Sequence, residues 1–197
     1  MKKRVFIAID IPEEIRDWLE EWQEELRRAG ITAKWVEREN FHITLKFLGE
    51  VEVGKLENIR ERLRRVARQH HPFSLRLKDV GVFPPGGVPQ IVWMGVTGDM
   101  PSLLMLHRQV EDQMFECGFP HDRRKFHAHL TLGRLKNHPA PQEEEFWAQF
   151  RGISAPLDVE EFLLMESVLT PQGPIYHVIE RFSLGKQGKA GLANSGV

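Results

Sequence analysis

Two short segments of the sequence each carry a histidine two residues before a threonine. His42 precedes Thr44 in the first motif (residues 42–44), and His129 precedes Thr131 in the second motif (residues 129–131). Because residues i and i+2 of a β-strand share a face, each motif on a strand presents an imidazole beside a hydroxyl on one face. The apolar neighbours of these residues lie on the opposite face. Placed opposite each other across a cleft, the two motifs supply two proton carriers and two hydroxyl donors.

Cleavage of a phosphodiester matches this set of groups. The reaction needs a base for the attacking oxygen and an acid for the leaving oxygen, on opposite sides of phosphorus. Histidine has an ordinary pKa of about 6.5, so a pair can hold one proton between its rings near neutral pH. The threonine hydroxyls can donate to the non-bridging oxygens as negative charge is redistributed there. A cyclic phosphate is strained and already activated, so we expect neither a metal ion nor another cofactor.

A zinc site is an alternative interpretation of the same residues. His127 shares strand parity with His129, and both could join His42 as metal ligands. No acidic or cysteine ligand accompanies them in the motif, and two matched His-x-Thr segments favour acid–base chemistry over a chance occurrence. The sequence does not distinguish which histidine is the acid and which is the base.

Several cationic residues are weaker candidates for contacts with phosphate. Lys46 shares parity with the first motif and is expected to help neutralise phosphate, or to be an ordinary edge-strand lysine. Arg123 and Arg124 lie in a basic run just before the second motif, where they suit RNA phosphates unless the run is a solvated loop. Arg134 falls on the parity opposite to the second motif and reaches the cleft only if the strand bends at Gly133.

Two aromatic residues are candidates for contacts with a nucleobase. Phe83 precedes a loop rich in proline and glycine, and Tyr176 follows a Pro-Gln-Gly-Pro turn. Either ring can stack on a base, although aromatic residues in such positions are more often part of the core.

The elements that position the motifs follow from apolar periodicity and turn residues. Strands are predicted over residues 5–9, 33–36, 41–48, 73–82, 91–96, 126–132, 159–169 and 176–184. Helices are predicted over residues 15–29, 56–66, 101–117 and 142–150. Several strand pairs lack a helix between them, which favours an α+β fold. Residues 41–45 and residues 128–132 have similar sequences, so we expect two lobes with one motif in each.

Composition places the chain among ordinary globular proteins. Its 197 residues, 41% of them hydrophobic, suffice for one bilobal domain over residues 1–184, followed by a flexible tail over residues 185–197 rich in Gly, Ala and Ser. The single cysteine, Cys117, excludes an intramolecular disulfide and a thiolate zinc site, and it suits a reducing compartment. No apolar run approaches the roughly 20 residues of a membrane span. We therefore expect a cytoplasmic protein without a membrane segment.

The balance of charge limits how the protein can handle nucleic acid. The net charge is −1, from 27 Lys and Arg against 28 Asp and Glu. A protein that coats nucleic acid along its length normally carries a basic excess. If the substrate is RNA, we expect a local cleft that binds an RNA end.

The two motifs and their flanks resemble the 2H phosphoesterase superfamily, and within it the RNA 2′,3′-cyclic phosphodiesterase family, also called the 2′-5′ RNA ligase family. The resemblance runs from about residue 4 to residue 184. It is carried by residues 5–9, 34–36, 40–49, 81–85, 92–96 and 126–134. One departure is Ala128, since family members often have proline at this position before the second histidine.

The resemblance implies a bilobal α+β fold in which two antiparallel-rich sheets with flanking helices surround a central cleft. It implies that His42, Thr44, His129 and Thr131 are catalytic, and that an RNA 2′,3′-cyclic phosphate is hydrolysed to a 2′-phosphomonoester without metal. Some relatives also run the related transesterification in reverse, joining a cyclic phosphate to a 5′-hydroxyl as a 2′,5′ bond. We expect a monomer whose partners are RNA ends. One alternative is an enzyme that acts on ADP-ribose cyclic phosphate or 2′,5′-oligoadenylate. Another is a non-catalytic RNA- or nucleotide-binding module, which the two matched motifs disfavour because binding alone needs no acid and base.

Overall fold

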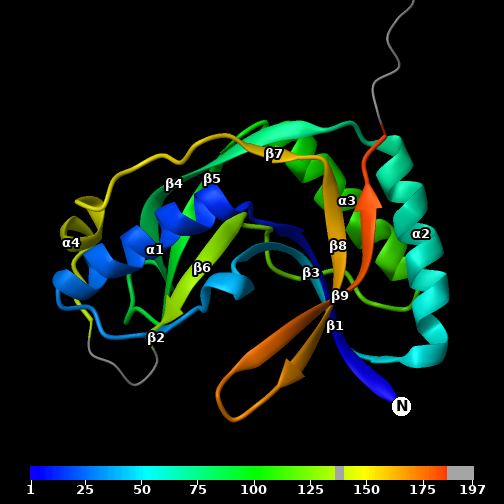
Figure 1. The fold of residues 1–197 in the computed structure, drawn as a ribbon, viewed down its shortest axis with the longest axis horizontal. Helices are drawn as coiled ribbons and strands as arrows, with labels where there is room; N and C mark the ends of the chain where they lie inside the picture. The colour runs from blue at the N-terminus through cyan, green and yellow to red at the C-terminus, as the bar shows by residue number, and fades with distance from the viewer. Residues whose placement is uncertain (136–139, 186–197) are drawn as a thin grey trace, which may run out of the picture.

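The computed structural model of the chain describes residues 1–135 and 140–185, in which a curled antiparallel sheet is flanked by helices (Figure 1). The α-helices are α1 (Glu13–Arg28), α2 (Leu56–Gln69), α3 (Met100–Glu116) and α4 (Glu144–Ala148). Two 3-10 turns are η1 (Arg38–Asn40) and η2 (Val53–Lys55). The strands are β1 (Lys2–Asp10), β2 (Lys34–Trp35), β3 (His42–Glu52), β4 (Phe73–Phe83), β5 (Ile91–Gly98), β6 (His129–Arg134), β7 (Leu157–Val159), β8 (Glu161–Leu169) and β9 (Pro174–Ser183).

The sheet has two halves that meet between the strands carrying the motifs. Its order is β7-β4-β5-β6-β3-β1-β8-β9, with β2 paired to β6. We call β3, β1, β8 and β9 the β3 half, and β6, β5, β4, β7 and β2 the β6 half. The α+β class with antiparallel strands and flanking helices is confirmed. The prediction of two separate sheets is corrected, because the pairing of Ile43 with Leu130 joins the halves into one.

Helices cover one face of each half. α2 and α3 pack on each other and on the β3 half, α4 packs on β4, and α1 crosses the β6 half (Figure 1). The α1 helix follows Pro12, has acidic residues in its first turn and arginines in its last turn, and so complements its own dipole. Gly30 ends it with a φ of +86°, a conformation that glycine adopts without steric cost. The predicted helix before Gly30 is therefore confirmed.

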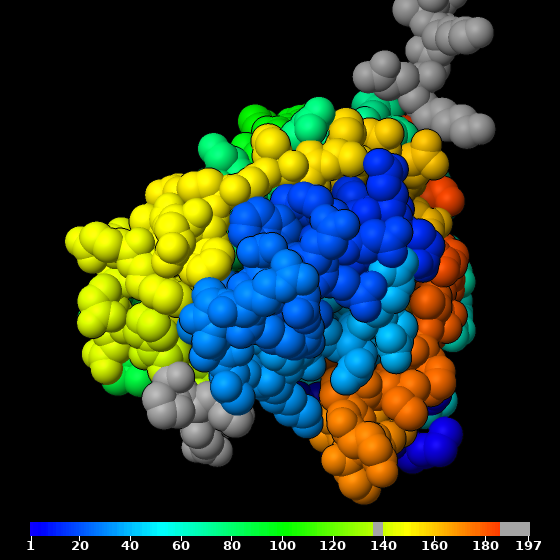
Figure 2. Space-filling view, turned by 60° about the vertical axis from the view of Figure 1, so that its left-hand side comes forward, coloured from blue at the N-terminus to red at the C-terminus, as the bar shows by residue number. Residues whose placement is uncertain are grey.

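The β8–β9 hairpin confirms a predicted pairing, but its first strand is shorter than expected. The predicted strand over residues 159–169 is broken at Glu160, where the chain passes from β7 in the β6 half to β8 in the β3 half. Near the tip, Asn40 Nδ2 donates to the Pro174 carbonyl at 3.0 Å, and Figure 2 shows the orange hairpin beside the blue segment that contains η1. The hairpin thereby forms a wall next to the start of β3.

The C-terminal prediction is only partly within the described residues. The backbone nitrogen of Gly185 donates to the Ala67 carbonyl at 3.1 Å, so this residue is bound to the end of α2. The rest of the predicted flexible tail, residues 186–197, lies outside the described residues. Within the described part of the chain, no helix is both long and apolar enough to cross a membrane.

Candidate active site

The two motifs lie side by side at the junction of the sheet halves. Ile43, the middle residue of the first motif, pairs with Leu130, the middle residue of the second. Because β3 and β6 are antiparallel, this register places His42 next to Thr131 and Thr44 next to His129. Strand spacing and rise put the two histidine Cα atoms at diagonal corners, about 8 Å apart. The four polar side chains therefore line one small area of the sheet from two sides.

Each histidine ring is held by a carbonyl two residues before it. The Nδ1 atom of His42 is 2.7 Å from the Asn40 carbonyl oxygen, and the Nδ1 atom of His129 is 2.7 Å from the His127 carbonyl oxygen. A carbonyl only accepts, so Nδ1 carries the proton and donates in both rings. The Nε2 atom of each neutral ring is therefore the nitrogen that can accept a hydrogen bond or a proton.

The same two contacts correct the predicted strand boundaries. The strands predicted over residues 41–48 and 126–132 begin instead at His42 and His129. In both cases the carbonyl two residues before the histidine accepts a hydrogen bond from the imidazole and not from a neighbouring strand. The chain before each motif is thereby bent onto its own histidine, which fixes the ring before the sheet ladder starts.

Burial lowers the pKa of both histidines below the ordinary value. For His42, loss of hydration is the main cause, and the charge of His129 adds to it. The bond to Asn40 and the charge of Asp10 act in the opposite direction. For His129, loss of hydration again dominates, and the bond to His127 opposes it. Burial thus favours the neutral form of both rings, and a bound phosphate anion would favour protonation of one of them.

Aromatic side chains surround each histidine. Ring centroids of Phe6 and Tyr176 lie 5.0 and 5.4 Å from that of His42, and the centroid of Phe83 lies 5.1 Å from that of His129. The two predicted base-stacking residues, Phe83 and Tyr176, are thus walls of the histidine sites. Burial raises the pKa of Tyr176, while the nearby charges of Arg134 and Arg4 oppose this rise.

The threonine hydroxyls are free to bind a ligand. Thr44 and Thr131 are half-buried beside the histidines. In residues 1–135 and 140–185, neither hydroxyl has a hydrogen-bond partner from the protein. A half-buried hydroxyl without a protein partner is available to donate to an oxygen bound between the rings.

Lys46 does not reach this site, and the prediction that it neutralises phosphate is wrong. In the register with β1, Thr44 pairs with Ala8 and Lys46 pairs with Ile7, so Leu45 is left unpaired as a β-bulge. One extra residue reverses the alternation of side chains along the strand. Lys46 therefore points to the helix-covered face, where its side chain is 1% exposed.

The second motif has a bulge at the equivalent position. In the register with β5, Thr131 pairs with Trp93 and Gly133 pairs with Val92, so Leu132 is unpaired. Arg134 was predicted on the face opposite to His129. The bulge reverses the alternation of side chains, so Arg134 lies on the same face as His129. Its charge acts on Tyr176, which agrees with that placement.

Phe47 is a further candidate for contact with a ligand, which the sequence pattern did not indicate. It follows His42 by five residues, as Arg134 follows His129, and both come after a bulge. Phe47 pairs with Phe6 and is 63% exposed, on the same face as His42. An exposed aromatic ring on the same face as the motif histidines is suited to stacking on a nucleobase.

Comparison with known proteins places the chain in a family. Its sequence matches the family described as LigT like Phosphoesterase over residues 9–93 and 99–176, which include both motifs. The chain belongs to the LigT-like phosphoesterases. The RNA 2′,3′-cyclic phosphodiesterase of Archaeoglobus fulgidus is 39% identical over 181 residues, covering 91% of this chain and 99% of that protein. The protein of the same name from Thermotoga maritima is 37% identical over 179 residues, covering 89% and 92%.

Solved structures of LigT-like phosphoesterases have the same fold. The crystal structure of TT0787 of Thermus thermophilus has a TM-score of 0.79 and 31% identity, and the match covers 94% of this chain and 100% of that one. The crystal structure of E. coli LigT complexed with 3′-AMP has a TM-score of 0.74 and 27% identity, covering 93% and 98%.

Two other predictions about this LigT-like site have different outcomes. Arg123 and Arg124 are exposed in the loop between α3 and β6, on the chain that leads to His129. In the described residues, no three His, Cys, Asp or Glu side chains are grouped so that they could hold a metal ion. The zinc set of His42, His127 and His129 is therefore not assembled in this part of the chain.

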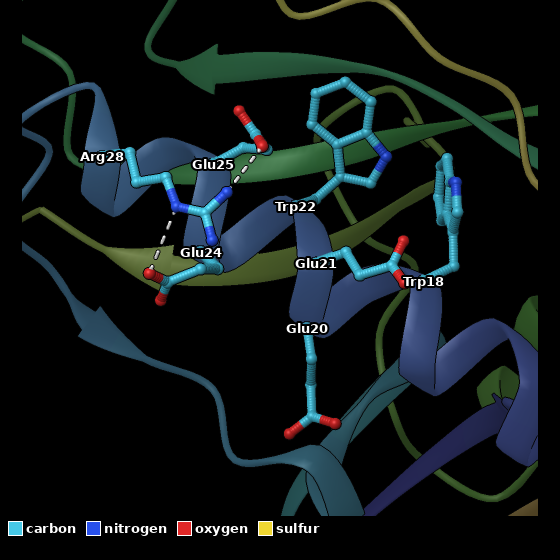
Figure 3. Close-up of a pocket in the computed structure, with 7 residues that line it drawn as sticks. All are labelled: Trp18, Glu20, Glu21, Trp22, Glu24, Glu25 and Arg28. Atoms are coloured by element: carbon cyan, nitrogen blue, oxygen red, sulfur yellow. Dashed lines mark hydrogen bonds and ion pairs between the residues drawn. The ribbon is translucent and has the colours of Figure 1, made fainter.

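An acidic hollow on the α1 helix of this phosphoesterase lies away from the motifs. Its volume is about 610 Å³, and two tryptophans and several charged residues of α1 line it (Figure 3). Arg28 forms ion pairs with Glu24 and Glu25 there, at 3.6 and 3.1 Å. Four glutamates line the hollow against one arginine, so it would repel phosphate.

Gly81 provides a first testable expectation for the site. A Cβ atom at Gly81 would lie 2.4 Å from Cη2 of Trp93, whose ring centroid is 6.2 Å from that of His129. Gly81→Ala must displace Trp93, so we expect it to lower the free energy of unfolding by about 1–3 kcal/mol and to lower kcat. Thermal unfolding and steady-state kinetics measure both. Gly54→Ala is the control, since a Cβ there meets nothing within 4 Å; equal behaviour of the two variants would contradict the expectation.

Proposed function

We propose that this LigT-like phosphoesterase hydrolyses the 2′,3′-cyclic phosphate of an RNA end to a 2′-phosphomonoester, with His42 and His129 as the acid–base pair. The observation that carries the proposal is the matched orientation of the two rings. Both donate from Nδ1 to a local carbonyl, and both keep Nε2 for a ligand. The relatives named RNA 2′,3′-cyclic phosphodiesterase support the choice of substrate.

The proposed reaction uses the two rings on opposite sides of phosphorus. One neutral histidine takes a proton from water at Nε2 as the water oxygen attacks phosphorus. The bond from phosphorus to the 3′ oxygen breaks, and the other histidine, protonated, gives its Nε2 proton to that oxygen. The pair finishes with its protonation reversed, so His42 and His129 exchange roles when the reaction runs backwards. In 2′,5′ ligation an RNA 5′-hydroxyl replaces water as the nucleophile, and the same P–O3′ bond breaks.

The remaining groups stabilise charge on the phosphate. In the proposal, Thr44 and Thr131 donate their hydroxyl protons to the non-bridging oxygens, each beside the histidine of the other motif. Such donors are aimed in advance at oxygens whose charge is redistributed in the transition state. Arg134, on the same face after the bulge, supplies a positive charge close to Tyr176. No metal ion is assigned a role.

Phe47 is proposed to stack on the base next to the cyclic phosphate. Base–aromatic stacking contributes about 1–3 kcal/mol, so Phe47→Ala should raise the KM for a cyclic-phosphate RNA end about tenfold. We expect kcat to change little, because the ring does not touch the reacting atoms. Leu104→Ala removes another exposed apolar side chain, on α3, and is the matched control. A KM unchanged by Phe47→Ala would remove Phe47 from the site.

A substrate panel in excess EDTA tests the proposed function. It compares RNA ends with 2′,3′-cyclic phosphate, 2′,5′-linked dimers and ADP-ribose 1″,2″-cyclic phosphate, and it identifies products as 2′- or 3′-phosphates. The proposal predicts that the RNA end reacts fastest and yields the 2′-phosphate. Faster reaction of either other substrate would contradict the choice of a cyclic-phosphate RNA end. Activity that EDTA abolishes and zinc restores would contradict the metal-free mechanism.

We further propose that the protein acts as a monomer in the cytoplasm. All four motif residues come from one chain, so no second copy is needed to complete the site. The single cysteine, Cys117, is half-buried, and burial raises the pKa of its thiol, which keeps it in the less reactive neutral form. Light scattering at the concentration of the kinetic assays tests the oligomeric state, and an active dimer with an inactive monomer would contradict it.

A further inference from the structure

The β-bulge that removes Lys46 from the phosphate site places it in a buried cluster behind the first motif. Its ammonium group donates to Glu111 Oε1 of α3 at 2.6 Å and to the Pro120 carbonyl at 3.0 Å. The side chains of Lys46 and Glu111 are 1% and 7% exposed. A buried ion pair with such distances has few other solvation partners, so its geometry is strongly constrained.

The same cluster binds the loop that leads into the second motif. We call residues 117–128 the α3–β6 loop. The other carboxylate oxygen of Glu111, Oε2, accepts from the backbone nitrogen of Asp122 at 3.0 Å, and the carboxylate of Asp122 lies 3.7 Å from the Lys46 ammonium. Pro120 and Asp122 are therefore both attached to the Lys46–Glu111 pair.

A second attachment follows at the end of the loop. The ring of Phe126 stacks on His107 of α3, with centroids 3.8 Å apart. The next residue, His127, supplies the carbonyl that orients the His129 ring. The exposed residues Arg123 and Arg124 lie between the two attachments. The position of the His127 carbonyl thus depends on a loop that is fixed from behind the first motif.

We propose that Lys46, with Glu111, is a positioning residue for His129: the pair fixes the α3–β6 loop and so sets the His127 carbonyl that holds the ring. Lys46 follows Thr44 by two residues, so one strand carries both a substrate-facing motif and the support for the other motif. The kcat measurement that tests this inference rests on the proposed function. The measurement of trypsin cleavage in the loop does not.

The test replaces the pair with apolar residues. Lys46→Met alone leaves Glu111 buried without its partner and is expected to unfold readily, whereas Lys46→Met with Glu111→Leu removes both charges and should fold. We expect the double variant to lose kcat about 10- to 100-fold on a cyclic-phosphate RNA end, since small misplacements of a reacting group have effects of this size. Trypsin should also cleave its folded form after Arg123, Arg124 or Lys125 at least about tenfold faster than wild type, because an attached loop has to open before cleavage.

Val110→Ala is the matched control, because Val110 is a fully buried neighbour of Glu111 on α3. It should be less stable than wild type yet keep the wild-type kcat and resistance to trypsin while folded. The inference is overturned if the folded double variant keeps either the wild-type kcat or the wild-type resistance to trypsin, or if Val110→Ala shows the same two losses. Failure of the wild-type protein to hydrolyse the RNA end would instead overturn the proposed function, and the trypsin comparison would then decide whether the pair fixes the loop.

Discussion

Replacing either motif histidine by alanine should lower kcat on a cyclic-phosphate RNA end by about 10²–10⁴-fold, the usual contribution of a general acid or base. Each ring is held by one local carbonyl with its Nε2 left free, so either substitution removes a positioned proton carrier. We expect His42→Ala and His129→Ala to have effects of similar size. The double variant should lose little more than either single variant, because the two rings act as a unit.

His177→Ala is the matched control for these variants. His177 is exposed on β9, where it pairs with Glu166 and, by strand alternation, lies on the face opposite to that of Tyr176. Its variant should keep wild-type kcat and thermal stability. Because the motif histidines are partly buried, circular dichroism of each variant must first establish that it is folded. A folded His42→Ala or His129→Ala protein with near-normal kcat would show that the pair does not carry the chemistry.

The pH dependence of kcat/KM should be bell-shaped with its maximum below about pH 6.5. The pKa of each motif histidine is lowered from that ordinary value, mainly by burial. The competent free enzyme has one ring protonated and one neutral, a state that is depleted above the higher and below the lower apparent pKa of the pair. Asp10→Asn removes a charge that raises the pKa of His42, so it should move the maximum to still lower pH.

Stability must be followed in the same pH range. A histidine whose pKa is lowered by folding binds its proton more tightly in the unfolded chain. Its neutral buried form therefore contributes full stability above about pH 6.5, and this contribution is lost as the pH falls toward the folded pKa. Rates are to be compared only where the protein remains folded. A flat profile from pH 5 to 8 in folded protein would contradict the role of two titrating histidines.

Much of the site could be predicted from side-chain alternation, and the wrong predictions of strand face have one cause. The motif residues precede the bulges, so their common face followed from strand parity. Lys46 and Arg134 follow the unpaired residues Leu45 and Leu132, and both were assigned to the wrong face. A leucine in a bulge has no local sequence signature, since bulging depends on how neighbouring strands pair.

One signal in the sequence could have indicated the bulge at Leu45 in β3. Phe47 and Leu48 are adjacent apolar residues at the end of an alternating run, and strict alternation allows only one of them to face the core. The structure buries Leu48 and exposes Phe47. The sequence carries no such signal that the two halves form one sheet. Their connection depends on the pairing of Ile43 with Leu130, two ordinary core residues far apart in the chain.

A substrate with sulfur in place of the 3′ oxygen of the cyclic phosphate tests the central claim most directly. Thiolate is a better leaving group than alkoxide and needs no proton from an acid. The variant that lacks the acid histidine should therefore recover most of its rate on this substrate, and the variant that lacks the base should not. The account predicts rescue of one variant, His42→Ala or His129→Ala, in excess EDTA. Rescue of both variants to the same extent, or of neither, would contradict an acid–base pair of these two histidines.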